Sequence, residues 1–155
     1  MTDLLITAAE VLETAFPSNE YVPEGMIVPA RIETAQLGFL RPVFGKLYDK
    51  LGEEPYAAFC RTYIKPALAY YVRSLMVVEQ CAAIGAAGVR QNKSAYTEAV
   101  PDSRLHRLRR QARNDADTLL DKAIDYVENN PAMFPEYDPK ENIRRRVLIK
   151  GGFIL

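Results

Sequence analysis

Apolar residues recur along most of the chain at the spacing of α-helices. Residues 7–16 open with a capping box, in which the Thr7 hydroxyl caps the helix start and a glutamate three residues later reaches back. Helical spacing returns after Pro29, which suits a first helical turn, and again over residues 43–51. Pro42 lies between these two segments and is expected to separate them, because proline lacks the backbone donor that a helix interior needs. The pattern therefore predicts three short helices at the start of the chain.

The longest apolar pattern predicts one helix over residues 54–84. Pro66 lies near its middle and removes one backbone donor, so we expect a kink close to Tyr63. Gly85 and Gly88 are expected to end this helix, and the polar residues that follow predict a loop. No alternation typical of a strand or hairpin occurs before residue 143.

A final helix is predicted over residues 102–127, followed by a proline-rich loop and a tail. Its narrow apolar stripe consists of Leu105, Leu108, Ala112, Leu119, Ala123 and Val127. Asn129-Asn130-Pro131 is a typical helix end. The pattern as a whole predicts an all-α fold: a small bundle of four to five helices with a kinked long central helix and an extended C-terminal tail. Residues 1–130 would form the helical domain, and residues 131–155 the proline-rich loop and C-terminal arm.

Composition is that of one ordinary globular domain. The chain has 155 residues, of which 48% are apolar and 26% charged. Lysine plus arginine equals aspartate plus glutamate, 20 against 20, so bulk charge argues for neither a nucleic-acid nor a membrane partner. No stretch approaches the roughly 20 apolar residues of a membrane span, and the N-terminus lacks the features of a signal peptide. We therefore expect no membrane partner and a cytosol-like compartment.

Candidate chemistry is sparse. Cys60 and Cys81 both lie within apolar helical patterns and are interpreted as reduced, buried residues. His106 is the only histidine, and no second ligand lies at metal-binding spacing from it. No catalytic triad, nucleophile motif or glycine-rich phosphate loop is present. We therefore expect no enzyme activity, no catalytic or metal-binding residues and no cofactor.

An arginine-rich run occupies the start of the final predicted helix. It consists of Arg104, Arg107, Arg109, Arg110 and Arg113. One interpretation is a solvated face answered by nearby acidic residues. The other is an electropositive patch that contacts phosphate groups or an acidic partner. We select four of these arginines by helical spacing as possible contacts with DNA or with an acidic partner: Arg104, Arg107, Arg110 and Arg113.

The C-terminal arm joins a basic triplet to an apolar run and an apolar chain end. Its candidate partner-binding residues are Arg144, Arg145, Arg146, Val147, Leu148, Ile149, Phe153, Ile154 and Leu155. Chain ends are usually polar, and an exposed apolar end is a liability unless it docks. It could dock on its own domain or on a neighbouring chain, as an added strand or a plug in a groove, and we favour the neighbouring chain.

Charge is also polarised between the two chain ends. Residues 1–30 contain five acidic residues and no lysine or arginine, whereas residues 140–155 contain five basic residues and only one acidic residue. Such ends can attract each other head-to-tail between copies, which is how heterologous contacts close into rings. They can equally pair within one chain.

One segment resembles a known family. Residues 30–51 read ARIETAQLGFLRPVFGKLYDKL, and similar features follow in Tyr63-Ile64-Lys65-Pro66-Ala67-Leu68-Ala69-Tyr70-Tyr71 and Gly88-Val89. This sequence resembles the small helical neck proteins of tailed phages and prophages of Bacteroidales-type bacteria, which are head–tail connector proteins, also called adaptor or head-completion proteins. The resemblance covers roughly residues 1–128 and rests on core and turn residues.

The resemblance implies a virion structural protein without enzyme activity. Connectors of that family form a ring, commonly twelve-fold, beneath the portal and around the DNA channel. The implied partners are other copies of the chain, the portal protein, further neck or tail proteins, and DNA that passes without sequence recognition. The implied location is the virion neck, reached from the host cytoplasm during assembly. The alternative is a small helical nucleic-acid-binding or regulatory module that uses the basic helix 104–113.

Overall fold

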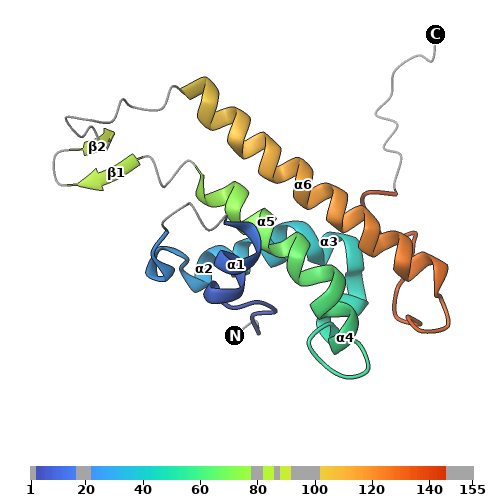
Figure 1. Cartoon of the computed structure of the whole chain (residues 1–155). Coiled ribbons are helices and arrows are strands. Elements are labelled where there is room, and N and C mark those ends of the chain that lie inside the picture. Colours follow the sequence, from blue (N-terminus) through green and yellow to red (C-terminus); the bar gives the residue numbers. More distant parts are fainter. Residues whose placement is uncertain (1–2, 17–21, 78–81, 86–87, 92–101, 146–155) are drawn as a thin grey trace, which may run out of the picture.

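The protein is mostly helical. A computed structural model describes residues 3–16, 22–77, 82–85, 88–91 and 102–145 (Figure 1). The α-helices are α1 (Ala8–Ala15), α2 (Pro29–Ala35), α3 (Arg41–Phe44), α4 (Ala57–Phe59), α5 (Lys65–Met76) and α6 (Asp102–Asn129). Shorter 3₁₀ segments cover Glu24–Met26 and Gly45–Lys50, and π-helical segments cover Gln36–Leu40 and Cys60–Ile64. The predicted all-α fold class is confirmed.

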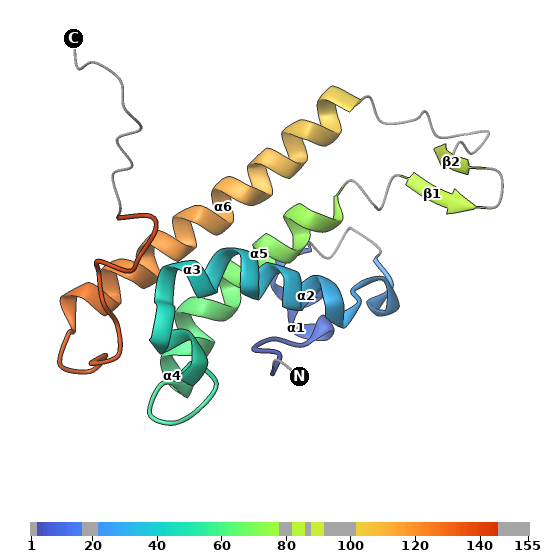
Figure 2. The same ribbon diagram turned by 180° about the vertical axis from the view of Figure 1, so that it is seen from behind.

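Helix α5 lies at the centre of the molecule. It packs against α6 on one side and against α1 and α2 on the other, as both views of the ribbon show (Figures 1 and 2). Leu68, Tyr71 and Val72 of α5 are fully buried, as are Leu120 and Ile124 of α6, which packs against α5. The core therefore forms where three helical segments distant in sequence meet on one central helix.

The start of α1 was predicted correctly. The Thr7 Oγ1 atom accepts a hydrogen bond from the backbone of Glu10, and the Glu10 carboxylate accepts one from the Thr7 backbone at 2.9 Å. Val11 and Ala15 form the buried side of the helix, which ends at Ala15 as the sequence indicates. Local capping chemistry was enough to place this element.

Two prolines are accommodated by π-helical turns. Gln36–Leu40 and Cys60–Ile64 each end just before an Arg-Pro or Lys-Pro pair, and the residue preceding each proline donates its backbone N–H five residues back. The wider turn relieves the clash between a proline ring and the preceding turn of helix. The prediction that Pro42 separates two helices is therefore wrong, because the helix continues through it into α3. The kink expected near Tyr63 stays a prediction.

The structure also corrects where the long helix begins and ends. Its helical run extends from Ala57 to Met76, not over residues 54–84. Beyond it, β1 (Ala82–Gly85) pairs antiparallel with β2 (Gly88–Gln91), with Ile84 opposite Val89. The sequence predicted helix and loop here. Two strands of four residues are too short for a clear alternating pattern.

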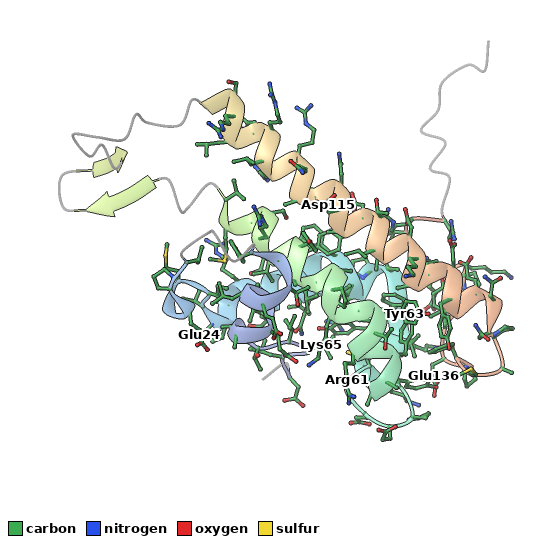
Figure 3. All side chains as sticks on the ribbon, in the orientation of Figure 1. Glu24, Arg61, Tyr63, Lys65, Asp115 and Glu136 are labelled. Carbon is green, nitrogen blue, oxygen red and sulfur yellow. The ribbon has the colours of Figure 1, made fainter. Side chains whose placement is uncertain are left out.

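Helix α6 extends past the core at its N-terminal end. Its buried residues begin only at Ala112 and continue through Ala116, Leu120, Ala123, Ile124 and Val127. Leu108, which the sequence placed in the apolar stripe, is 37% exposed. Since α5 ends at Met76, the first turns of α6 stand clear of most other elements (Figure 3).

The segment after α6, Pro131–Arg145, folds back along the molecule and is called here the C-terminal strap. Phe134 of the strap is buried against Phe59 and Tyr126, with ring centroids 4.8 Å and 6.0 Å away. The backbone N–H of Ile143 donates to the Pro42 carbonyl at 3.2 Å. The strap thus connects the end of α6 to the end of α3.

Gly45 ends α3 beside the strap. Its φ of +52° with ψ of −121° is a backbone conformation that residues with a Cβ rarely adopt. A Cβ added there would also lie 2.9 Å from the Glu141 Oε2 atom of the strap. Glycine is needed here for the backbone angle, because the Glu141 carboxylate is the end of a flexible side chain and can move aside.

We therefore expect Gly45→Ala to lower the free energy of unfolding by about 1–3 kcal/mol, the usual cost of a strained backbone conformation. Urea unfolding followed by circular dichroism would measure it. Gly38→Ala is the matched control, because its Cβ would meet nothing within 4 Å inside a helical segment. The control should be neutral or stabilising, and an equally stable Gly45→Ala protein would contradict this account.

Candidate functional site

Helix α6 is divided by charge into two halves. Its N-terminal half carries the arginine-rich run, and its C-terminal half carries the acidic residues Asp115, Asp117, Asp121, Asp125 and Glu128. Arg104 near the positive end of the helix dipole and Glu128 near the negative end both oppose that dipole. The two halves of α6 therefore carry opposite charge.

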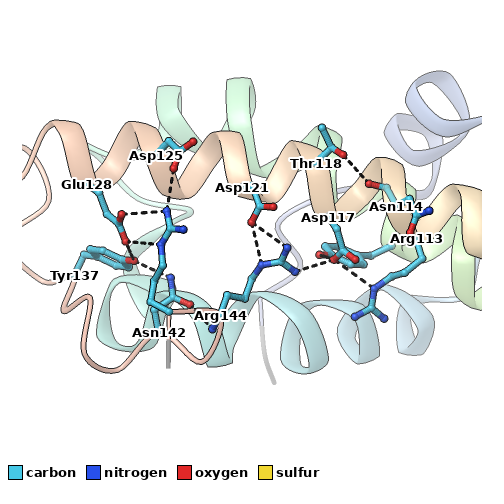
Figure 4. A network of polar contacts seen from close by, with 12 residues as sticks. Arg113, Asn114, Asp117, Thr118, Asp121, Asp125, Glu128, Tyr137, Asn142 and Arg144 are labelled. Atoms are coloured by element: carbon cyan, nitrogen blue, oxygen red, sulfur yellow. Dashed lines mark hydrogen bonds and ion pairs between the residues drawn. The ribbon is translucent and has the colours of Figure 1, made fainter. Parts of the chain in front are cut away.

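Four of these five acidic residues pair with two arginines of the C-terminal strap (Figure 4). Arg144 binds Asp117 through Nη1 at 2.9 Å and Asp121 through Nε at 3.0 Å. Arg145 binds Asp125 at 2.9 Å and Glu128 at 3.1 Å, both through Nη2. Two consecutive arginines thus bridge four acidic residues on successive turns of α6.

A buried asparagine places these arginines. Asn142 is fully buried, and its Oδ1 atom accepts the backbone N–H of Arg144 at 2.9 Å. Its Nδ2 atom donates to the Tyr137 hydroxyl at 2.8 Å, and that hydroxyl donates to Glu128 at 2.9 Å. Burial and the Glu128 carboxylate together raise the pKa of Tyr137 to about 12, although the Asn142 hydrogen bond opposes this. The tyrosine therefore remains a proton donor at neutral pH.

Asp117 joins the strap to the core. The hydroxyl of the buried Tyr71 donates to Asp117 Oδ1 at 2.6 Å, and Arg113 Nε lies 3.4 Å from the same atom. Burial raises the pKa of Asp117, but hydrogen bonds from Tyr71 and Arg144 outweigh it and leave the pKa below its ordinary value. The carboxylate is therefore ionised and holds α5, α6 and the strap together.

This arrangement gives two residues of the expected partner-binding arm contacts within their own chain. Arg144 and Arg145 were predicted to bind a neighbouring chain, but the structure pairs both with α6 of their own chain. The remaining arm residues, Arg146 to Leu155, lie outside the described residues, so their docking stays a prediction. A sequence signal for the acidic partners existed, since Asp117, Asp121 and Asp125 recur every four residues.

The basic half of α6 lacks such neutralisation. Arg104, Arg107, Arg109 and Arg110 are exposed, and within the described part of the chain none of them pairs with an acidic side chain. Arg113 differs, because its guanidinium lies over Phe39, 4.1 Å from the ring centroid, and over Tyr71 at 5.2 Å. Of the four arginines selected from the sequence, Arg113 is therefore also part of the packed structure.

A groove of about 300 Å³ lies between α5 and the basic half of α6, and we call it the basic groove. It is lined by Phe39, Ser74, Leu75, His106, Arg109, Arg110 and Arg113. Arg104 and Arg107 do not line it, although sequence spacing grouped Arg107 with Arg110. Arg109 was not among the selected residues. The rotation of α6 against the core decides this. Leu108 shares a face with the buried Ala112, four residues later, but is 37% exposed because the core ends there.

Other chemistry is limited in the described structure. Cys60 is buried, and burial raises the pKa of its thiol to about 11, so it stays protonated. Cys81 lies outside the described residues. Among the residues that the structure places, no three metal-binding side chains come together. No helix in the same set has both the length and the apolar character needed to cross a membrane.

Comparison with known proteins identifies a family. Residues 38–147 match the family of unknown function DUF6712, and the match spans more than half of the chain. The chain therefore belongs to this family. Searches of curated proteins and of solved structures found no match.

The unequal burial of the two strap arginines leads to a test of the strap. The Arg144 side chain is 27% exposed and that of Arg145 is 42% exposed, while their more buried partners, Asp117 and Glu128, are similar at 30% and 28%. We expect Arg144→Gln to lower the free energy of unfolding by about 1–2 kcal/mol and Arg145→Gln by about 0.5 kcal/mol or less. Both variants remove one charge, so each controls for the other. Equal losses in urea unfolding would contradict the bridging role of Arg144.

Proposed function

We propose that this member of DUF6712 is a structural subunit of a phage virion, an adaptor that assembles as a ring between portal and tail around the DNA channel. The observation that carries the proposal is the basic half of α6, which extends beyond the core with four exposed arginines. A ring of such subunits would present many positive charges to the DNA backbone. Contacts of this kind bind phosphates without reading base sequence.

The difference in packing between the two halves of α6 supports this role. The acidic half, bound by Arg144 and Arg145, completes the fold of the subunit. The basic half contributes little burial before Ala112, so it is available for contacts outside the subunit. A rigid domain that carries one exposed charged helix is suited to repetition around a channel.

The C-terminal arm supplies the proposed contact between subunits or with the portal. Because Arg144 and Arg145 belong to the subunit fold, the arm proper begins at Arg146. Its sequence retains two basic residues, the apolar run Val147-Leu148-Ile149 and the apolar end Phe153-Ile154-Leu155. Portal and further neck or tail proteins are its proposed partners, and the virion neck its proposed location after assembly in the host cytoplasm. The role includes no chemical step and no cofactor.

Solution mass measured by light scattering tests this proposal. The full chain, mixed with the portal protein of the same genome, is expected to form a large complex of fixed stoichiometry. Truncation after Arg145 should abolish that complex while leaving helix content and thermal midpoint unchanged, because Arg144 and Arg145 are retained. Truncation that leaves the complex intact would contradict the role of the arm.

A matched pair of full-length variants separates the two kinds of contact in the arm. Replacing Phe153, Ile154 and Leu155 by serine should abolish assembly if the apolar end docks. Replacing Arg146 and Lys150 by glutamine should weaken assembly mainly at low salt. A chain that stays indifferent to the portal under all these conditions would refute the adaptor proposal.

The same four arginines favour a second candidate function, a small nucleic-acid-binding or regulatory module. Such a module would bind duplex DNA by itself, with an affinity that falls steeply as salt rises. It would not respond to the portal. Duplex binding without portal binding would select this candidate, and portal binding would select the adaptor.

A further inference from the structure

We propose that the basic groove is a phosphate-binding site, which holds consecutive phosphates of one strand of a DNA duplex. The inference rests on the proposed function for the source of the phosphates, and on the geometry of the groove for the site itself. It places the DNA contact on one face of α6. Exposure alone would not distinguish among the arginines of the basic half.

Four cationic or hydrogen-bonding side chains converge on this face. His106, Arg109, Arg110 and Arg113 lie at positions i, i+3, i+4 and i+7 of one helix, and all four line the groove. This face is about 10 Å long at 1.5 Å rise per residue. Consecutive phosphates of one strand of B-DNA are farther apart than their axial rise of about 3.4 Å, because the strand winds around the axis. The length of the cationic face therefore suits about two consecutive phosphates.

The electrostatics of the groove favour an anion. No acidic side chain lines it. Of the residues that line the groove, only Arg113 pairs with an acidic side chain that the structure places, Asp117 on the neighbouring turn of α6. Within the described residues, Arg109 and Arg110 have no acidic partner. Like charges on one helix face repel each other, and Arg104 near the positive end of the helix dipole adds to the field. A bound phosphate would relieve this repulsion.

One arginine of the groove is held in place before any ligand binds. Phe39 and Tyr71 stack with ring centroids 4.3 Å apart, and the Arg113 guanidinium lies over both rings. Its Nε atom faces Asp117, which fixes the orientation of the planar group. Guanidinium groups bind phosphate oxygens through paired N–H donors, and an ordered one loses less conformational freedom on binding. Arg109 and Arg110 then complete the site from the exposed side.

Helix α6 itself provides a matched control. Arg104 and Arg107 belong to the same exposed half but do not line the groove. The double variants Arg109→Gln/Arg110→Gln and Arg104→Gln/Arg107→Gln each remove two positive charges from the same three turns. All four side chains are exposed, so both variants are expected to keep the wild-type helix content. Any difference between them reports position and not total charge.

The experiment measures binding of a fluorescent DNA duplex to the full chain by anisotropy, from about 50 mM salt upward. The groove variant is expected to lose about tenfold in affinity and about two units of the salt slope, one for each phosphate contact. The control variant should lose clearly less in both quantities. Equal losses by the two variants, or no binding by the wild-type chain at the lowest salt, would overturn the proposal.

Two further arms define the ligand. Inorganic phosphate should displace the duplex only from proteins with an intact groove. The phosphate concentration needed should be far higher than that of competing unlabelled duplex, because a single phosphate contacts only one part of the face. Polyglutamate of equal charge should bind more weakly than the duplex. Polyglutamate binding as tight as that of DNA would overturn the proposal in favour of an acidic protein partner.

Failure of this inference can be told apart from failure of the adaptor proposal. The groove variant should still form the portal complex in light scattering, because it leaves the sequence of the arm unchanged. A groove that binds DNA in a chain indifferent to the portal would leave the site standing and remove the adaptor role. Portal assembly together with equal losses of DNA affinity by the two variants would support the adaptor role and remove the groove site.

Discussion

The hydrogen bond from Tyr71 to Asp117 is the interaction on which the rest of the structure depends. Tyr71 is fully buried in the central helix α5, and its 2.6 Å bond reaches the middle of α6. Asp117 in turn binds Arg144 of the strap and faces Arg113 of the basic groove. A buried hydroxyl needs a partner, and a carboxylate at the core boundary needs cationic ones. One satisfied pair thus fixes the position of α6 and orients both charged halves around it.

The rotation of α6 set by this pair explains what sequence patterns could and could not predict. Local signals placed the capping box at Thr7 and both ends of α6 within two residues, because capping and helix termination depend on neighbouring residues. The apolar stripe was only partly right, since Leu108 is exposed where the core has ended. Helical spacing also selected Arg107, whereas the groove is lined by Arg109. Long-range contacts, which no local pattern encodes, decide which arginines share a groove.

The same limit applies to proline and to the strap. Proline chemistry predicts a break, but packing of both flanking turns keeps the helix continuous through Pro42 by widening one turn. Arg144 and Arg145 were expected to bind a neighbouring chain, whereas their partners in their own chain were visible in the sequence only as aspartates at four-residue intervals some twenty residues earlier. Spacing identifies faces of helices, and tertiary structure decides which face meets which segment.

The charge order of α6 favours an anionic ligand at its basic half. Basic residues near the N-terminus and acidic residues near the C-terminus both oppose the helix dipole, so this order does not stabilise an isolated helix. In the acidic half, Arg144 and Arg145 compensate for it. In the basic half, within the described residues, only Arg113 has an acidic partner. The acidic end of α6 is thus paired within its own chain, whereas the basic end remains suited to an anion from outside. Arg113, which is already ordered, lies in the groove where that anion would bind.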